Sequence, residues 1–283
     1  MNYRHAFHAG NFADVFKHAI LVGLIDALKA KSAPFCYIDT HAGAGQYDIH
    51  GEEAKKTGEY IDGAQRLLIA NSLPDSLRPY FEVLRKVNSA DDGGHLKTYP
   101  GSPLIASTLM RDSDRAVLCE LQGDEADQLK ALFARDARIG VHQRDGYAAL
   151  SALVPPRERR GLVLIDPPFE AQRAEFRAIE ATIKSAYARW PTGTYAVWYP
   201  IKLRPHLLPF YRWFTRTSVK KTLMAELMLH PDDSPLRLNG CGMVIVNPPW
   251  QFDKLLEKLL PDLLRLLAQD KSASQRVEWL VRE

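Results

Sequence analysis

The sequence predicts an α/β fold: a doubly wound, mostly parallel sheet of seven strands that carries a helical insertion. Of its 283 residues, 46% are apolar and 25% are charged, which is enough to bury a large core. Short apolar segments alternate with helical patterns, as in parallel sheets that helices cover on both faces. Polar and glycine-containing motifs follow the ends of several apolar segments, where such sheets bind ligands.

The first elements are a helix and a buried strand. Apolar residues recur at helical spacing in FADVFKHAILVGLIDALKAK, which predicts a helix over about residues 11–30. Pro34 ends this pattern. Phe35 to Asp39 then forms an apolar strand that runs into a glycine-containing loop.

Residues 46–98 differ in character from the chain on either side. GEYIDGAQRLLIAN and SLRPYFEVLRKVNS are amphipathic helical patterns, broken by LPDS, with no convincing strand between them. We therefore expect a helical insertion subdomain over 46–98, and one main domain formed by 1–45 and 99–283.

Beyond the insertion, strands and helices alternate. A helix over 103–111 is followed by six further apolar strands, most of them separated by helical stretches. The six candidates are Ala116 to Leu121, IGVHQRD, Gly161 to Pro168, TYAVWYP, TLMAELML and GMVIVNPP.

Composition and charge exclude several classes of protein. No run reaches the roughly 18 apolar residues that cross a bilayer. The three cysteines stand far apart in apolar segments, as reduced cysteines do, so we expect a soluble cytoplasmic protein. The histidines before residue 42 have no compact zinc-site spacing, so no metal is expected. The net charge of +3 neither requires nor excludes a nucleic-acid partner, and nothing indicates an obligate protein partner, which favours a monomer.

The loop after the first strand suits a nucleotide-like ligand. It reads Asp39-Thr-His41-Ala-Gly43-Ala-Gly45, and glycine lets a backbone approach a ligand closely and turn sharply. The third glycine of the dinucleotide-binding pattern is replaced by Asp48, which argues against a nicotinamide cofactor. A plain strand-to-helix turn that uses glycine is the alternative.

Two later strand ends carry further acids. Glu120 can accept both ribose hydroxyls of an adenosine-type ligand, and Asp145-Gly146 can meet its adenine end. Taken singly, Glu120 is equally well explained as an exposed acid at a helix entry, and Asp145-Gly146 as a turn. Their order after the glycine loop favours one shared ligand site.

The segment Asp166-Pro167-Pro168-Phe169 follows an apolar strand and indicates a reaction. An exocyclic amine of a nucleobase is a poor nucleophile because its lone pair is delocalised into the ring. The Asp166 carboxylate and the Pro167 carbonyl can accept its two N–H groups while Phe169 stacks on the base. A device that only reverses the chain is the alternative.

A second segment, Asn247-Pro248-Pro249-Trp250, has the same pattern with an amide in place of the acid. Ligands of doubly wound sheets bind where strand order reverses, next to the first strand. Asp166 ends about the fourth strand and Asn247 about the last, which favours Asp166. We expect the second segment to terminate its strand and to pack its indole.

Basic and aromatic residues are interleaved over 202–221, and three arginines stand at Arg157, Arg159 and Arg160. Cations beside aromatic rings suit single-stranded RNA, whose phosphates and bases they bind. An amphipathic helix with its aromatics in the core and its charges in solvent is the other interpretation.

Taken in order, DTHAGAG, ELQ, RDG and DPPF resemble the class I S-adenosylmethionine-dependent methyltransferases that modify exocyclic amines. The fuller set of YRHAFHAGNFADVFKH, DTHAGAGQY, TGEY, YPGSPLIA, GLVLIDPPF, TGTYAVWYP and VNPPW is similar to the ribosomal RNA large subunit methyltransferase J family. That family methylates an adenine N6 in 23S ribosomal RNA, and the similarity runs from Tyr3 to VEWLV, over essentially the whole chain.

The resemblance implies S-adenosylmethionine as cofactor and 23S ribosomal RNA as partner. Asp166 is then the proton acceptor, with Pro167 and Phe169 beside it, Lys17 lies next to the cofactor, and Tyr3 touches the RNA. Phe169 stands where the family usually has tyrosine, which keeps the stacking but removes a phenolic hydrogen bond. The cofactor site implied is lined by Lys17, His18, His41, Gly43, Ser102, Glu120, Asp145, Gly146 and Asp166.

The sequence thus predicts an S-adenosylmethionine-dependent adenine-N6 methyltransferase of 23S ribosomal RNA, acting on protein-free or early-assembly RNA. An amino-methyltransferase of DNA adenine or cytosine, a nicotinamide-dependent oxidoreductase and a non-catalytic RNA-binding protein are the alternatives.

Overall fold

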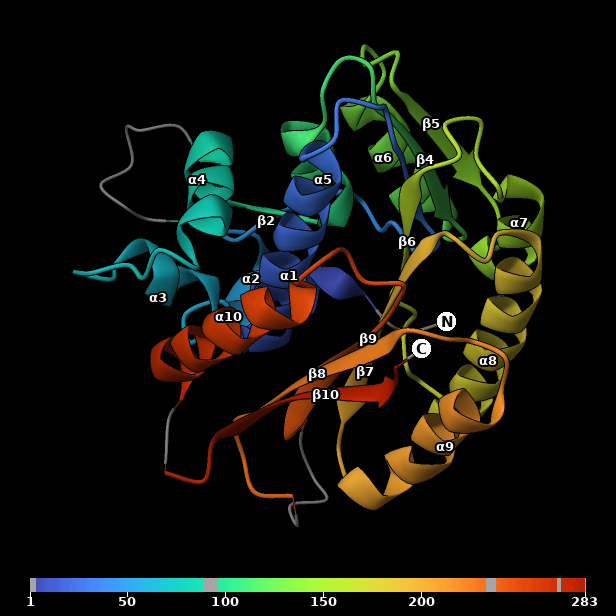
Figure 1. Ribbon diagram of the computed structural model, residues 1–283. Helices are drawn as coiled ribbons and strands as arrows, with labels where there is room; N and C mark the ends of the chain where they lie inside the picture. The colour runs from blue at the N-terminus through green and yellow to red at the C-terminus, as the bar shows by residue number, and fades with distance from the viewer. Residues whose placement is uncertain (1–3, 89–95, 233–237, 269–270, 283) are drawn as a thin grey trace.

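A computed structural model describes residues 4–88, 96–232, 238–268 and 271–282 of the chain. A central sheet of eight strands has helices packed on both faces (Figure 1). Its strand order is β10-β8-β9-β7-β6-β1-β4-β5. In chain order these strands are β1 (Cys36–Asp39), β4 (Arg115–Glu120), β5 (Ile139–Gln143), β6 (Gly161–Ile165), β7 (Thr194–Ile201), β8 (Thr222–Met228), β9 (Gly240–Val246) and β10 (Ser274–Val281).

Strand directions divide the sheet into two parts. β1 pairs in parallel with both β4 and β6, β4 with β5, and β6 with β7. β9 runs antiparallel to β7 and β8, and β10 runs antiparallel to β8. The chain order therefore reverses at β1, and the carboxyl ends of β1, β4, β5 and β6 share one edge.

The predicted fold class is confirmed, but the sheet has eight strands instead of seven. The additional strand is β10, at the edge beside β8. Its sequence SQRVEWLV mixes polar and apolar residues, and none of its side chains is fully buried. An edge strand of this kind lacks the continuous apolar run that identified buried strands such as β1 and β6.

The helices form two layers, each with its own hydrophobic cluster. α1 (Phe12–Lys29), α5 (Ser102–Leu109) and α10 (Phe252–Leu267) pack on one face of the sheet. α7 (Gly146–Leu153), α8 (Gln172–Arg189) and α9 (Leu208–Arg216) pack on the other (Figure 1). α6 (Gly123–Leu132) follows β4, and the short 3₁₀ helices η1 (His5–Phe7) and η2 (Arg204–Leu207) precede α1 and α9.

α1 confirms the helix expected over residues 11–30. The Asn11 side chain caps its first turn by accepting a hydrogen bond from Asp14 N. Most of its side chains are buried, because it packs against β6, β9, α5 and α10. Three of the buried residues, Asp14, Lys17 and His18, are polar.

The segment 46–98 contains the two expected helices, α3 (Ala64–Leu68) and α4 (Arg78–Val87), and a short helix that was not expected, α2 (Glu52–Thr57). It also begins with a strand that the sequence did not reveal, β2 (Gln46–Asp48), which pairs antiparallel with β3 (Thr98–Pro100). Buried Leu67, Tyr80 and Leu84 belong to the same hydrophobic cluster as α1. The helices of this segment therefore extend the core of the main sheet.

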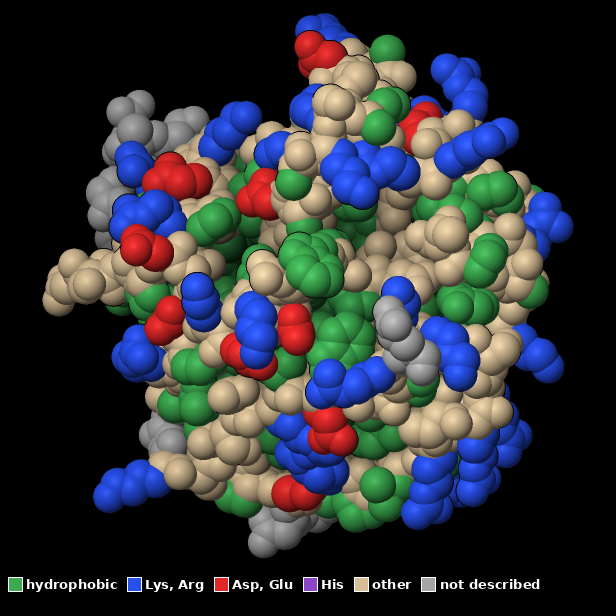
Figure 2. Space-filling view, in the orientation of Figure 1, with side chains coloured by type: hydrophobic (Ala, Val, Ile, Leu, Met, Phe, Trp, Pro, Cys, Tyr) green, Lys and Arg blue, Asp and Glu red, His purple; other side chains and the backbone are tan. Residues whose placement is uncertain are grey.

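Three of the four aromatic residues of the segment 202–221 lie in the core, and Trp213 is partly buried. Phe210, Tyr211 and Phe214 of α9 are buried, whereas Arg212 and Arg216 are exposed. Figure 2 shows Lys and Arg side chains gathered over this part of the surface. The amphipathic-helix interpretation is confirmed for the three buried rings.

The Asn247-Pro-Pro-Trp250 segment follows β9. Asn247 adopts a positive φ of 49°, and its amide donates to the carbonyls of Pro191 and Gly193, each at 2.8 Å. Trp250 is 90% exposed, so the expected packing of its indole is wrong. Within the described residues, no helix is long and apolar enough to cross a membrane.

Candidate active site

A cavity of about 1000 Å³ opens at the edge where β1, β4, β5 and β6 end. Its walls come from the loops after these strands, from η1 and the first turns of α1, and from the connection between α2 and α3. The sequence-predicted residues Lys17, His18, His41, Gly43, Ser102, Glu120, Asp145, Gly146, Asp166, Pro167 and Phe169 all line it. Tyr3 lies outside the described residues.

The glycine loop and Glu120 meet in the cavity wall. Gly43 has a φ of +60°, a conformation that side chains rarely adopt. Its N–H donates to Glu120 Oε2 at 2.8 Å, and Gln122 N–H donates to Oε1 at 2.7 Å. These two hydrogen bonds fix the Glu120 carboxylate against the loop, although Gly43 and Glu120 are 77 positions apart.

Asp39 is the buried acid at the end of β1. Its carboxylate accepts hydrogen bonds from the hydroxyls of Tyr37 and Ser102, at 2.6 and 2.7 Å, and from His41 N–H at 3.2 Å. Burial raises the pKa of Asp39 to about 6, despite these donors. Ser102, in the first turn of α5, therefore joins the β1 loop through Asp39.

His41 lies on the cavity side of the same loop. Its Nδ1 is 2.8 Å from Thr40 Oγ1, and its ring meets the edge of Tyr147 at 4.8 Å between centroids. Burial lowers the pKa of His41 to about 4, so the ring is neutral near pH 7.

Asp145 and Gly146 form the turn from β5 into α7. The Asp145 carboxylate caps α7 by accepting from the N–H groups of Tyr147 and Ala148. A Cβ on Gly146 would lie 2.0 Å from the Thr40 carbonyl oxygen, so only glycine allows this turn to approach the β1 loop. The predicted turn thus serves both as a helix cap and as cavity wall.

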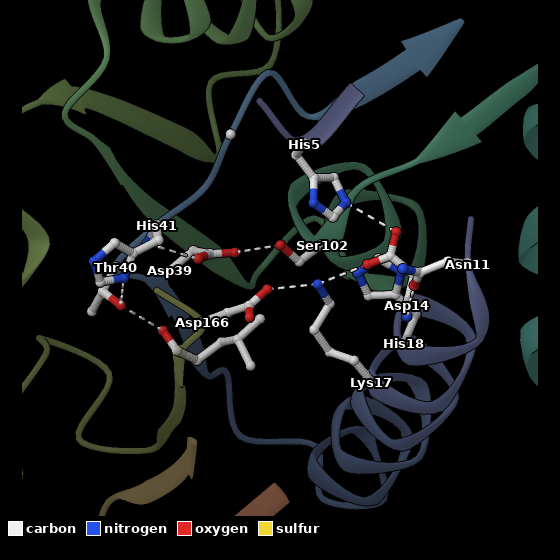
Figure 3. A network of polar contacts seen from close by, with 12 residues as sticks. His5, Asn11, Asp14, Lys17, His18, Asp39, Thr40, His41, Ser102 and Asp166 are labelled. Atoms are coloured by element: carbon white, nitrogen blue, oxygen red, sulfur yellow. Dashed lines mark hydrogen bonds and ion pairs between the residues drawn. The ribbon is translucent and has the colours of Figure 1, made fainter. Parts of the chain in front are cut away.

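Asp166 follows β6, the strand next to β1, and is joined to α1 by an ion pair (Figure 3). Lys17 Nζ lies 2.6 Å from Asp166 Oδ2 and 2.9 Å from Asp14 Oδ1. Burial alone would lower the pKa of Lys17, but the two carboxylates raise it well above its usual value. The ammonium therefore remains charged between Asp14 and Asp166.

The Asp166 carboxylate keeps one oxygen available. Its side chain is 16% exposed and lines the cavity. Among the described residues, the hydrogen bonds and ion pairs of Asp166 all involve Oδ2 and Lys17. Oδ1 can therefore accept a hydrogen bond from a ligand.

Phe169 provides an aromatic surface beside this carboxylate. It is partly buried and packs against Phe176 and Trp198, with ring centroids 5.3 and 5.8 Å away. Trp198 belongs to β7 and also lines the cavity, with Lys17 Nζ 5.9 Å from its ring centroid. Stiff Pro167 and Pro168 hold this aromatic wall at a fixed place after β6.

Asp14, Trp198 and Glu59 are cavity residues that sequence reasoning missed. Asp14 holds Lys17 and also accepts from Gly10 N–H and pairs with His5, each at 2.9 Å. His8 and Asn11 bind Glu59 in the insertion at 3.0 Å. For Asp14, the i, i+3 spacing from Lys17 among apolar residues of the helix was a signal that could have revealed it.

No cluster of three or more histidine, cysteine, aspartate or glutamate side chains within the described residues is arranged to hold a metal ion. The N-terminal histidines His5 and His8 instead contact the carboxylates of Asp14 and Glu59.

The cavity residues fit an adenosine-type methyl donor. Glu120 and Asp145 place acceptors next to the glycine loop, and the buried Nε2 of His18 has no hydrogen-bond partner among the described residues. Such an orphaned polar atom is costly unless a ligand or water satisfies it.

Comparison with known proteins gives consistent matches. A family model described as ribosomal RNA large subunit methyltransferase D, RlmJ, matches residues 32–281. The chain is 40% identical to ribosomal RNA large subunit methyltransferase J of Escherichia coli K12 and 39% identical to that of Haemophilus influenzae Rd, in each case over all of both chains. A crystal structure of a Legionella pneumophila protein superposes with a TM-score of 0.87 at 36% identity, covering 96% of this chain and 98% of that one.

Proposed function

Because this chain belongs to the RlmJ family of ribosomal RNA large subunit methyltransferases, we propose that it methylates an adenine N6 in 23S ribosomal RNA with S-adenosylmethionine as methyl donor. We propose that it does so in the cytoplasm, as a monomer and without a metal ion. The substrate is protein-free or early-assembly RNA, in which a base can leave its stack at a cost of a few kcal/mol.

The observation that carries the proposal is the position of Asp166. It lies at the carboxyl end of the strand beside β1, at the cavity that the glycine loop and Glu120 also line. The Lys17 ammonium binds Oδ2 and leaves Oδ1 toward a ligand. This is the placement that an amine acceptor next to a methyl donor requires.

In this mechanism Asp166 Oδ1 and the Pro167 carbonyl accept the two N–H groups of the adenine amine. The lone pair of the nitrogen is then directed out of the ring system instead of into it. The N–H becomes acidic as the nitrogen is alkylated, and the Asp166 carboxylate takes up that proton. Lys17 holds the carboxylate in place throughout.

Phe169 and Trp198 hold the base. A base that enters beside Phe169 stacks on its ring, a contact worth about 1–3 kcal/mol. Orientation of this kind can supply about 7–11 kcal/mol of a barrier when the reacting atoms are held near contact.

S-adenosylmethionine, when bound, supplies an activated methyl group. Glu120, Asp145 and His18 are the residues that would hold it, with the backbone of Gly43 and Gly146 giving room for close approach. His41 and Ser102 support the β1 loop that forms this wall.

The test is transfer of a labelled methyl group by the purified protein to 23S ribosomal RNA transcribed in vitro. Nucleoside analysis should find the label in N6-methyladenine, with less transfer to assembled large subunits. Label in a methylated cytosine, or label on assembled subunits alone, would contradict the substrate assignment, and binding of NAD instead of S-adenosylmethionine would contradict the reaction.

A further inference from the structure

A hydrogen-bonded chain of buried side chains joins the insertion to the cavity. Tyr80 of α4 and Tyr99 of β3 have their hydroxyl oxygens 2.9 Å apart, and Tyr99 Oη lies 2.6 Å from His18 Nδ1. None of the three residues is more than 1% exposed. The rings of His18 and Tyr99 also stack, with centroids 5.6 Å apart.

His18 stands at the cavity end of this chain. It lines the cavity, and its Nε2 is buried without a hydrogen-bond partner in the part of the molecule that the structure describes. Burial, and then the charge of Lys17, lower the pKa of His18 well below its usual value, although Asp14 acts in the opposite direction. The imidazole is therefore neutral near pH 7 and carries a single hydrogen.

The hydrogens of the two tyrosine hydroxyls determine which ring nitrogen of His18 carries its single hydrogen. No other hydrogen-bond partner of either tyrosine hydroxyl is found among the described residues. With the hydrogen on Nδ1, His18 would donate to Tyr99 and Tyr99 to Tyr80, which leaves the Tyr80 hydroxyl hydrogen buried without an acceptor. With the hydrogen on Nε2, Tyr80 donates to Tyr99, Tyr99 donates to Nδ1, and both hydroxyl hydrogens are used.

The first arrangement leaves two buried groups without a partner, the Tyr80 hydroxyl hydrogen and the Nε2 lone pair of His18, and each unpaired buried polar group is destabilising. The second arrangement is favoured because it leaves only one. It leaves one donor of the chain unused, the Nε2–H of His18. That donor belongs to the residue that lines the cavity, where a ligand can supply the acceptor.

We propose that Tyr99, with Tyr80 behind it, is a positioning residue that fixes His18 in the tautomer with hydrogen on Nε2, so that His18 donates a hydrogen bond to the methyl donor. The identity of this ligand rests on the proposed function, whereas the tautomer does not. The hydroxyl of Tyr80 in the insertion and that of Tyr99, which directly follows it, thus act on the cavity without touching the ligand.

The tautomer is measured on the ligand-free protein by long-range ¹⁵N–¹H correlation of the histidine rings. The protonated and lone-pair nitrogens of a neutral imidazole resonate in separate ranges, and the His18 signals are assigned by their absence in His18→Gln. We expect the hydrogen on Nε2 in the wild type and a mixture of tautomers in Tyr99→Phe, where Nδ1 has lost its donor.

Affinity is measured by calorimetry with S-adenosylhomocysteine, which has no methyl group to transfer. Tyr99→Phe should weaken binding about three- to tenfold, as for loss of one oriented hydrogen bond. The matched control is Tyr195→Phe, which removes an equally buried hydroxyl that donates to the Trp190 carbonyl in the other hydrophobic cluster. Tyr195→Phe should leave the His18 tautomer and the affinity as in the wild type.

Two results would overturn the proposal: hydrogen on His18 Nδ1 in the wild type, or wild-type affinity in a folded Tyr99→Phe variant. If Tyr99→Phe does not fold, Tyr80→Phe replaces it. That variant keeps the Tyr99–His18 hydrogen bond, so it should retain the Nε2 tautomer, and a switch to Nδ1 would refute the hydrogen count. A wild-type protein that shows the Nε2 tautomer but binds no S-adenosylhomocysteine would refute the proposed function and leave the tautomer standing.

Discussion

Two segments of this molecule share one sequence pattern and lie in opposite settings. Asp166-Pro-Pro-Phe169 and Asn247-Pro-Pro-Trp250 each follow an apolar strand with a polar residue, two prolines and an aromatic. The first lines the cavity, and its polar residue is held by Lys17. In the second, the Asn247 amide binds backbone carbonyls and the Trp250 ring is exposed.

Strand direction explains the difference. β6 and β7 are parallel, whereas β9 is antiparallel to β7, with Val246 opposite Tyr195 at the start of β7. The carboxyl end of β9 therefore lies at the edge of the sheet opposite to Asp166, where the Thr194 hydroxyl binds the Asn247 carbonyl at 3.0 Å. The same motif acquires a different role because the strand before it is reversed.

The largest expected effect is that of Asp166→Ala. Loss of the amine acceptor and proton acceptor should lower kcat/KM for methyl transfer about thousandfold, or about 4 kcal/mol. Lys17 keeps its pairing with Asp14, so the variant should fold. Initial rates with labelled S-adenosylmethionine measure the effect, and circular dichroism confirms folding. Near-normal turnover in a folded variant would show that Asp166 has no catalytic role.

His41, at the cavity edge, should make the stability of the fold depend on pH, because burial opposes its protonation. Its pKa falls from 6.5, the ordinary value for histidine, to about 4 in the folded protein, so below pH 6.5 the unfolded chain takes up a proton that the folded protein excludes. The free energy of unfolding is therefore highest above pH 6.5 and decreases by up to about 3 kcal/mol as the pH falls toward 4. Denaturant unfolding of wild type and His41→Gln between pH 4 and 7 should show the variant losing less, whereas parallel curves would contradict the assignment.

Asn247→Ala should affect stability and not catalysis. The substitution removes two hydrogen bonds to backbone carbonyls, one exposed and one partly buried, and leaves alanine at a φ of 49°, which should cost about 2 kcal/mol of unfolding free energy. Urea unfolding measures the loss, and kcat/KM should stay within about twofold of wild type. Loss of activity in a stably folded Asn247→Ala would mean that both motifs contribute to the reaction.

The aromatic residues give the smallest contrast. Phe169→Ala should lower kcat/KM about tenfold, near the low end for one base-stacking contact, because Trp198 and Phe176 still form part of the wall. Trp250→Ala at the opposite edge is the matched control and should leave the rate unchanged. Equal losses in the two variants would refute the stacking role of Phe169.

The sequence predicted the parts of the fold that are local in the chain. β1, β4 and β6 are continuous apolar runs because they are buried on both faces, and their final residues mark the cavity edge. β10 was missed because its side chains are only partly buried, and β2 because it has three residues. Trp250 was placed wrongly because an aromatic after two prolines does not reveal which side of a turn faces solvent.

The candidate site was predictable as a set of strand ends but not as a network. Gly43, Glu120, Asp145 and Asp166 were found from their positions after strands. The pairing of Lys17 with Asp166 spans 149 positions and depends on how α1 packs on the sheet. The Tyr80–Tyr99–His18 chain depends on the position of the insertion, which no local pattern in the sequence encodes.

The most direct test of the central claim is mass mapping of 23S ribosomal RNA from cells that lack this protein and carry either the wild-type or the Asp166→Ala gene. We expect one adenine to lack its N6-methyl group in the deletion strain, to regain it with the wild-type gene and to remain unmethylated with Asp166→Ala. Full methylation in the deletion strain, or restoration by Asp166→Ala, would contradict the central claim.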